Sequence, residues 1–143
     1  MIGNVKVFRS AEETASALAD ELAQMICSFD EDRTFNIALS GGSTPKLLFH
    51  ALADRHRDSV NWHKVSLFWV DERCVPPDDP ESNYGMTLHA LLERIDIPPV
   101  NVHRIMGEAE PYSEAVRYSE VIEKGVSFKN ALPFFDVILL GLG

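Results

Sequence analysis

The sequence has few of the residues that define several common classes of protein. Its two cysteines, which lack metal-ligand spacing, are too few for a disulfide scaffold or a cysteine-based zinc site. Lysine and arginine are also scarce, 13 against 22 acidic residues, and the net charge of -9 argues against a nucleic-acid partner. No run approaches the roughly 18 apolar residues of a membrane span, and the amino terminus does not resemble a signal peptide. We therefore expect a cytoplasmic protein that binds neither nucleic acid nor membrane.

The overall composition is that of an ordinary globular domain. Hydrophobic residues make up 45% and charged residues 24% of its 143 residues, which is close to the average for folded proteins. A chain of this length can bury a core of its own. Internal repeats, low-complexity tracts and linkers are absent from the sequence. We therefore treat residues 1–143 as a single domain.

Apolar runs of strand length alternate with amphipathic stretches along the chain. The clearest helix covers residues 10–29 and opens with a Ser10-x-x-Glu13 capping box. The run 65–70 is almost continuously apolar, which is typical of a parallel strand buried on both faces. The remaining expected strands are 5–8, 35–40, 102–105 and 135–140. The remaining expected helices are one that starts at Pro45, one over 84–94 and one over 112–124. The inward-facing residues expected in the last are Tyr112, Ala115, Val116, Ser119 and Ile122.

This alternation predicts an α/β fold of a particular kind. We expect a Rossmann-like, doubly wound, mostly parallel sheet with right-handed crossovers and helices on both faces. The last expected strand, 135–140, lacks the helix that should follow it in such a sheet. We therefore expect the sheet to be truncated and residues 1–143 to form the amino-terminal portion of a larger unit.

A turn of glycines and hydroxyl residues follows the expected strand at 35–40. Gly41 and Gly42 would let the backbone approach a ligand closely, and the amides of Ser43 and Thr44 would open a helix and point toward an anion. These four residues are predicted to cradle a phosphate group. The alternative is an ordinary tight connection in which Ser43 or Thr44 caps the helix. Nucleotide binding is disfavoured because neither a Walker loop nor a dinucleotide fingerprint is present.

Three consecutive charged residues follow the apolar run at 65–70. In open α/β sheets ligands bind beyond the carboxyl ends of the strands, so Asp71 and Arg73 are predicted to be catalytic. Alternation along the chain should point these two side chains to one side and Glu72 to the other. Arg73 would hold an anionic group or stabilise developing charge, and Asp71 would orient an imidazole or a substrate hydroxyl. The alternative is a solvated cluster in which the charges pair with one another.

The long irregular segment 74–82 leads from these charges to the next expected helix, a length at which functional loops become common. Asn83 opens that helix and is predicted to bind substrate, with a plain N-cap as the alternative. The five histidines lack metal or triad spacing, so none of them is predicted to act as a base.

These segments together resemble the 6-phosphogluconolactonase family, within a larger group that includes glucosamine-6-phosphate deaminase. The resemblance rests on the Ser-Gly-Gly-Ser-Thr-Pro turn at 40–45, on Asp-Glu-Arg with its proline loop and Ser-Asn-Tyr-Gly at 82–85, and on 101–105. It extends to the closing segment 134–143, in which Gly141 and Gly143 form a third turn expected to face the substrate. In the family this Gly-x-Gly continues into Asp-Gly-His-Thr, whose histidine is the expected base. We therefore expect these 143 residues alone to lack the catalytic base.

The resemblance implies hydrolysis of 6-phospho-D-glucono-1,5-lactone to 6-phosphogluconate, the second step of the oxidative pentose phosphate pathway. The partner would be a small sugar phosphate, and neither a metal nor an organic cofactor would be required, because a lactone is already an activated ester. One alternative is an amino-sugar-phosphate deaminase or isomerase, although the resembling deaminases usually carry an aromatic residue where Arg73 stands. Another is a non-catalytic sugar-phosphate-binding effector domain, which the lack of a helix-turn-helix segment before the sheet disfavours. The sequence does not indicate the oligomeric state.

Overall fold

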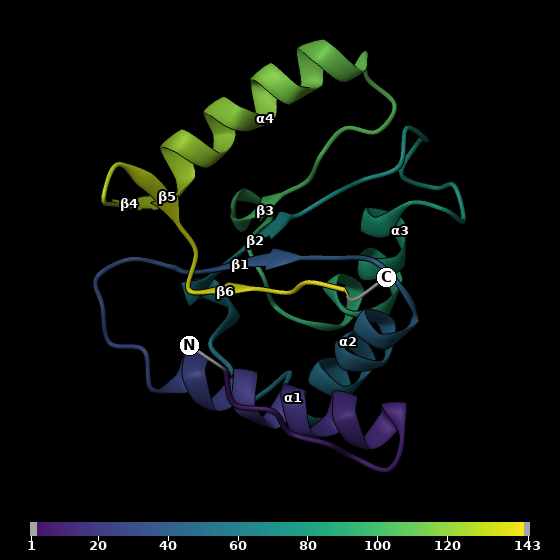
Figure 1. Ribbon diagram of the computed structural model, residues 1–143, viewed down its shortest axis with the longest axis vertical. Coiled ribbons are helices and arrows are strands. Elements are labelled where there is room, and N and C mark those ends of the chain that lie inside the picture. Colours follow the sequence, from purple (N-terminus) through teal and green to yellow (C-terminus); the bar gives the residue numbers. More distant parts are fainter. Residues whose placement is uncertain (1–2, 142–143) are drawn as a thin grey trace.

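The computed structural model describes residues 3–141 and contains a parallel sheet with helices on both faces (Figure 1). The strand order is β3-β2-β1-β6, and Phe35 of β1 lies beside Val65 of β2. The sheet strands are β1 Phe35–Leu39, β2 Val65–Trp69, β3 Val102–His103 and β6 Val137–Ile138. The α-helices are α1 Ala11–Cys27, α2 Ser43–Arg55, α3 Asn83–Ala90 and α4 Pro111–Gly125. Short 3-10 turns cover Trp62–Lys64, Leu92–Arg94 and Pro99–Asn101. The predicted α/β class and parallel sheet are confirmed.

One face of the sheet carries the main hydrophobic core. Helices α1 and α2 lie on this face (Figure 1), and the core residues of β1 and β2 contact them. Every residue of β1 and β2 is buried, which explains why both strands are apolar at nearly every position. The largest fully buried side chains here are Phe49, Ile37, Leu39, Leu48, Leu67 and Leu91.

The opposite face is covered more thinly by α4, with a small cluster formed by Phe68, Tyr118 and Val126. Polar contacts supplement this packing. The Tyr118 hydroxyl accepts a hydrogen bond from the Trp69 amide at 2.7 Å and donates to the His103 carbonyl oxygen at 3.0 Å. Burial raises the pKa of Tyr118 to about 12. Helix α4 is therefore tied to the ends of β2 and β3 by the phenol.

The buried face of α4 differs from the predicted one. Glu114 and Tyr118 are its buried residues, whereas Val116 is 64% exposed. The Met106 amide donates to the Glu114 carboxylate at 2.7 Å, and Arg117 pairs with the same carboxylate at 2.6 Å. Ile122 packs against the small cluster as predicted, whereas Tyr112, Ala115, Val116 and Ser119 are exposed. The prediction was wrong for these four because it scored only apolar spacing, while polar anchors orient this helix.

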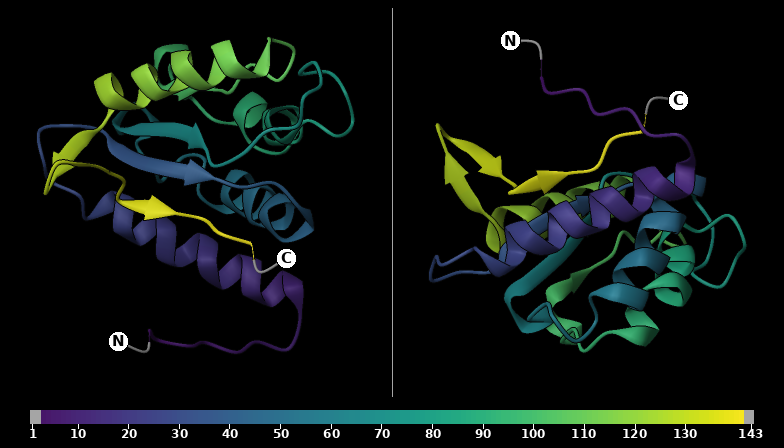
Figure 2. Two further views of the ribbon diagram at one scale, coloured as in Figure 1. Left: turned by 45° about the horizontal axis from the view of Figure 1, so that its top comes forward. Right: turned by 90° about the horizontal axis from the view of Figure 1, so that it is seen from below.

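Two further predictions on strands need correction. Residues 5–8 do not form a strand: Val5 is 80% exposed, and the segment is held beside α1 by the Lys6–Glu21 ion pair. The expected strand 135–140 shortens to β6, and an unpredicted hairpin of β4 Ser127–Lys129 and β5 Leu132–Phe134 precedes it. Asn130 and Ala131 turn this hairpin with φ values of 53° and 61°. Figure 2 shows the hairpin projecting beside the end of α4.

At the edge where the strands begin, which we call the starting edge, an ion pair joins the segments that precede β1 and β6. The Arg33 guanidinium donates to both Asp136 oxygens at 2.7 Å, and the Asn36 amide donates to the same carboxylate at 2.8 Å. Burial raises the pKa of Asp136, but these donors outweigh it and hold the pKa below its usual range. The guanidinium also lies 4.7 Å from the centre of the Phe29 ring. These contacts fix β6 beside β1.

No helix within residues 3–141 combines the length and apolar character that crossing a lipid bilayer requires.

Candidate active site

The sheet strands end at one common edge, which we call the ligand edge. Because the strands are parallel, the segments that follow them converge there (Figure 2). Strand β1 leads into residues 41–44, the glycine turn, and β2 leads into residues 71–74, the charged turn. Strand β3 leads into 104–107, and β6 into 139–141. The predicted site residues within the described chain therefore come from turns or helix starts at this edge.

The glycine turn forms the start of α2 without a side-chain cap. Gly42 is the N-cap residue with a φ of 116°, a conformation that strains any residue with a side chain. Ser43 and Thr44 are the first residues of the helix, so the prediction that one of them caps it was wrong. Both are exposed at the ligand edge. Uncapped amides at a helix start provide donors and a favourable dipole for an anion, which is the arrangement expected of a phosphate cradle.

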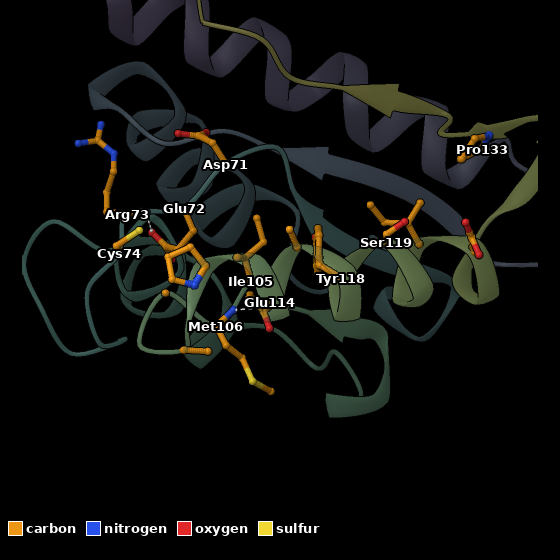
Figure 3. A pocket seen from close by; sticks show the side chains of 16 residues that line it. Asp71, Glu72, Arg73, Cys74, Ile105, Met106, Glu114, Tyr118, Ser119 and Pro133 are labelled. Atoms are coloured by element: carbon orange, nitrogen blue, oxygen red, sulfur yellow. Dashed lines mark hydrogen bonds between the residues drawn. The ribbon is translucent and has the colours of Figure 1, made fainter.

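Within the charged turn, Asp71 and Arg73 are exposed, whereas Glu72 is partly buried. Figure 3 shows Asp71 and Arg73 extending to one side, while the Glu72 carboxylate turns back toward the Arg73 amide. The same carboxylate accepts hydrogen bonds from the amides of Asn83 and Tyr84 at 2.7 and 2.9 Å. This division of directions agrees with the alternation expected from the sequence.

Arg73 is not a partner of Glu72. The Glu72 carboxylate is taken up by backbone amides and by the Ser82 hydroxyl at 3.0 Å. Within residues 3–141 the Arg73 guanidinium forms no ion pair, while Arg33, Arg55, Arg94, Arg104 and Arg117 each have a carboxylate partner. The alternative of a self-paired surface cluster therefore does not describe this turn.

Asn83 links the charged turn to the glycine turn. Its side chain is 7% exposed and donates a hydrogen bond to the Asp71 carbonyl oxygen at 3.1 Å. A Cβ atom added at Gly41 would collide with the Asn83 carboxamide, so a side chain at this position would have to displace that group. Ser82, whose hydroxyl accepts from the Gly85 amide at 3.0 Å, is the N-cap of α3, so the N-cap alternative for Asn83 was wrong. Substrate contact by Asn83 stays a prediction.

Sequence reasoning missed the role of Gly107, which follows β3. A Cβ atom at this position would collide with the Arg73 carbonyl oxygen, so the glycine lets the 104–107 segment press against the charged turn. The signal was a glycine shortly after an expected strand, a place where two backbones often approach closely. Together Gly107 and α3 brace the backbone that carries Arg73.

A cleft of about 580 Å³ lies between the charged turn and α4 (Figure 3). Asp71, Glu72 and Arg73 line one end of it. Ala115 and Ser119 of α4, which were predicted to face the core, border this cleft, and so does Ile122. Among the described residues, the glycine turn and Gly141 do not line this cleft.

The remaining predicted residues lie at the end of the chain. The Leu139 amide donates to the Ala38 carbonyl oxygen at 2.9 Å, so the segment after β6 runs alongside β1 toward the ligand edge. Gly141 lies on this segment, exposed and with open space around its Cα. Gly143 lies outside the described residues. Binding of substrate by these two glycines stays a prediction.

Two aromatic residues near the site have unusual polar environments. Burial lowers the pKa of His103, whose ring stacks on Phe68 with a centroid distance of 4.4 Å. The Trp69 ring packs edge-on against Tyr84 at 5.4 Å, and its buried indole nitrogen has no partner within the described chain. No group of three or more His, Cys, Asp or Glu side chains among residues 3–141 could hold a metal ion.

Known proteins are similar to this chain in sequence and in fold. The family model described as glucosamine-6-phosphate isomerases/6-phosphogluconolactonase matches residues 9–143. The chain belongs to this family. The resemblance drawn from the two turns is therefore confirmed.

Similar proteins carry lactonase names. A 6-phosphogluconolactonase of Treponema pallidum is 47% identical over 107 residues, which cover 75% of this chain and 44% of the relative. One of Haemophilus influenzae is 43% identical over 136 residues, covering 91% of this chain and 55% of the relative. The crystal structure of devB protein superimposes with a TM-score of 0.88 at 41% identity, covering 96% of this chain and 57% of that one. The chain thus spans about half the length of the curated relatives it matches.

Proposed function

We propose that this chain forms the amino-terminal part of a 6-phosphogluconolactonase, which hydrolyses 6-phospho-D-glucono-1,5-lactone to 6-phosphogluconate. The observation that carries the proposal is Arg73. It is exposed at the ligand edge on a braced turn, and it has no carboxylate partner within residues 3–141. A free guanidinium in an acidic protein suits an anionic substrate. The lactonase names of the relatives support the same reaction.

The proposed reaction assigns a task to each turn. The glycine turn would hold the phosphate group through the start of α2, which fixes the lactone relative to the attacking water. Water forms a bond to the lactone carbonyl carbon, and the carbonyl oxygen becomes an oxyanion that Arg73 would stabilise. Collapse of this intermediate breaks the bond to the ring oxygen, which leaves with a proton as the new hydroxyl. Asp71 would orient the base or a substrate hydroxyl.

The base that removes a proton from water is assigned to none of the described residues. His103 lines a separate cavity with Tyr84 and Arg117, and the shortage of other candidates agrees with the family resemblance. That resemblance implies a histidine in an Asp-Gly-His-Thr segment, and Asp71 would be suited to orient its imidazole. We further propose that the enzyme works in the cytoplasm on a free sugar phosphate and binds neither nucleic acid nor membrane. The net charge of -9 on these 143 residues argues against a nucleic-acid partner.

The test is a pair of assays on the protein expressed from its complete reading frame. We expect hydrolysis of freshly generated 6-phosphogluconolactone above its spontaneous rate, followed through enzymatic oxidation of the product. Glucosamine 6-phosphate should release no ammonia. Ammonia release without lactone hydrolysis would replace the proposal by a deaminase. Binding of 6-phosphogluconate without either reaction would replace it by an effector domain.

A further inference from the structure

The Glu72 carboxylate accepts four hydrogen bonds from the protein itself. One carboxylate oxygen accepts from the Arg73 and Asn83 amides at 2.8 and 2.7 Å, and the other accepts from the Ser82 hydroxyl and the Tyr84 amide at 3.0 and 2.9 Å. A carboxylate offers about four acceptor sites, so Glu72 has none left for a ligand. It therefore cannot serve the reaction as a base or as a substrate contact.

The donors come from both ends of the proline-rich loop, residues 74–81. Arg73 precedes the loop, and residues 82–84 follow it as the start of α3. The negative carboxylate lies at the positive end of this helix, where a charge is stabilised by the free amides. Glu72 thus closes the loop and fixes the charged turn to a rigid element.

This closure also sets the direction of the residues on either side. Because Glu72 points toward α3, alternation turns Asp71 and Arg73 away from it and toward the ligand edge. One of the three amides that donate to Glu72 belongs to Asn83. The Asn83 side chain in turn donates to the Asp71 carbonyl oxygen and contacts Gly41. One carboxylate thereby relates the charged turn to the glycine turn.

We infer that Glu72 is a positioning residue of the active site: by binding the start of α3 it holds Asp71 and Arg73 in place relative to the glycine turn. This inference rests on the proposed lactonase function. It assigns Glu72 no contact with substrate. The main core is built largely from α1, α2 and the sheet, with Ala90 and Leu91 at the end of α3, and Glu72 is not part of it.

The decisive variant is Glu72→Gln in the protein expressed from its complete reading frame. The amide group keeps the size of the side chain but replaces an acceptor oxygen with an NH₂ donor, which opposes the donors that surround it. A displacement of the reacting groups by about 1 Å can cost roughly 100-fold, so we expect kcat to fall by about 10- to 100-fold. KM should change little, because the glycine turn stays intact. Exchange of the Arg73, Asn83 and Tyr84 amide protons with solvent should accelerate.

The matched control is Glu81→Gln, which removes a charge from the same loop. The Glu81 side chain is exposed and forms no ion pair within the described residues, so kcat and amide exchange should stay at their wild-type values. Glu72→Asp keeps the charge but is too short to reach all four donors. It should give a kcat between those of the wild type and Glu72→Gln.

The outcomes separate this inference from the proposed function. A wild-type protein that does not hydrolyse the lactone refutes the proposed function. An active wild type with unchanged kcat in Glu72→Gln refutes the positioning role alone. So does an equal loss in Glu81→Gln, since the effect would then follow charge and not the contacts. If Glu72→Gln does not fold, Glu72→Asp decides, and a wild-type kcat in that variant overturns the inference.

Discussion

Two arginines lie at opposite edges of the same sheet and differ in whether a carboxylate binds the guanidinium. At the starting edge, Arg33 binds Asp136 through two hydrogen bonds of 2.7 Å and also pairs with Glu31. At the ligand edge, Arg73 has no carboxylate partner within residues 3–141. A guanidinium whose donors are taken up by the protein stabilises the fold, whereas one with free donors is available to an anion. The presence or absence of a carboxylate partner therefore distinguishes the structural arginine, Arg33, from the proposed substrate-binding arginine, Arg73.

The largest effect is expected when each of these two arginines is replaced by lysine in a separate variant. Arg73→Lys keeps the charge but loses the fork, so lactonase kcat/KM should fall by roughly 10²–10³-fold, as for a lost oxyanion donor. Its melting temperature should match the wild type. Arg33→Lys should show the reverse, a lower melting temperature with normal kcat/KM for the folded protein. Wild-type kinetics in Arg73→Lys would remove this residue from the site.

A smaller effect, on stability alone, is expected when the carboxylate partner of Arg33 is changed. Asp136→Asn leaves Arg33 partly buried with a weaker partner, since the side chains are 20% and 10% exposed. The free energy of unfolding should fall by about 1.5–3 kcal/mol, the range for hydrogen bonds to charged groups. Urea denaturation measures this change. Asp58→Asn, which breaks the exposed pair with Arg57, is the control and should cost no more than about 1 kcal/mol.

The same pair gives a pH dependence with a definite sign. Because the pKa of Asp136 in the folded protein lies below its ordinary value of 3.8, its contribution is complete above about pH 4 and is lost as pH falls through the lower folded value. The difference in unfolding free energy between wild type and Asp136→Asn should therefore be constant near neutrality and shrink in acid. A difference that grows in acid would contradict the assignment.

The smallest expected effect concerns Arg104, which also lies at the ligand edge but is paired. Its guanidinium binds Glu108 at 2.6 and 3.0 Å, and this hydrogen bond lowers the pKa of Glu108 to about 2. Both groups are partly exposed, so Arg104→Lys should change the unfolding free energy by about 0–1 kcal/mol. Lactonase kinetics should stay at wild type. A large loss of kcat/KM would show that position at the edge matters more than pairing.

The sequence predicted those parts of the fold that depend on local pattern. The apolar run at 65–70 indicated a buried strand, which the structure places at Val65–Trp69. The glycines at 41–42 indicated a turn, and Gly42 has a positive φ there. The strand at 5–8 failed because a short alternating run indicates a strand only if a neighbour is there to pair with it. The face of α4 failed because the Tyr118 hydroxyl finds its partners on β2 and β3, far away in sequence.

The candidate site was predictable to a similar extent. The order of residues placed Asp71 and Arg73 at a strand end, since topology alone brings such residues to the ligand edge. The positioning role proposed for Glu72 was not predictable, because it depends on a contact with the start of α3. The sequence does not specify how the intervening loop brings these two segments together. Asn83 and Gly41 were chosen separately, and only the structure brings them into contact.

The environment of Trp69 gives the protein an optical reporter of its own site. Trp69 is 3% exposed and its indole nitrogen lacks a hydrogen-bond partner in the described chain. Its ring packs against Tyr84, whose amide donates to Glu72. Such an indole should emit at short wavelength and resist quenching by acrylamide. The other tryptophan, Trp62, is also buried but donates to the Arg57 carbonyl oxygen at 3.1 Å, on a segment away from the site. A Trp62→Phe variant would leave a single emitter, whose spectrum would follow loosening of the charged turn without any added label.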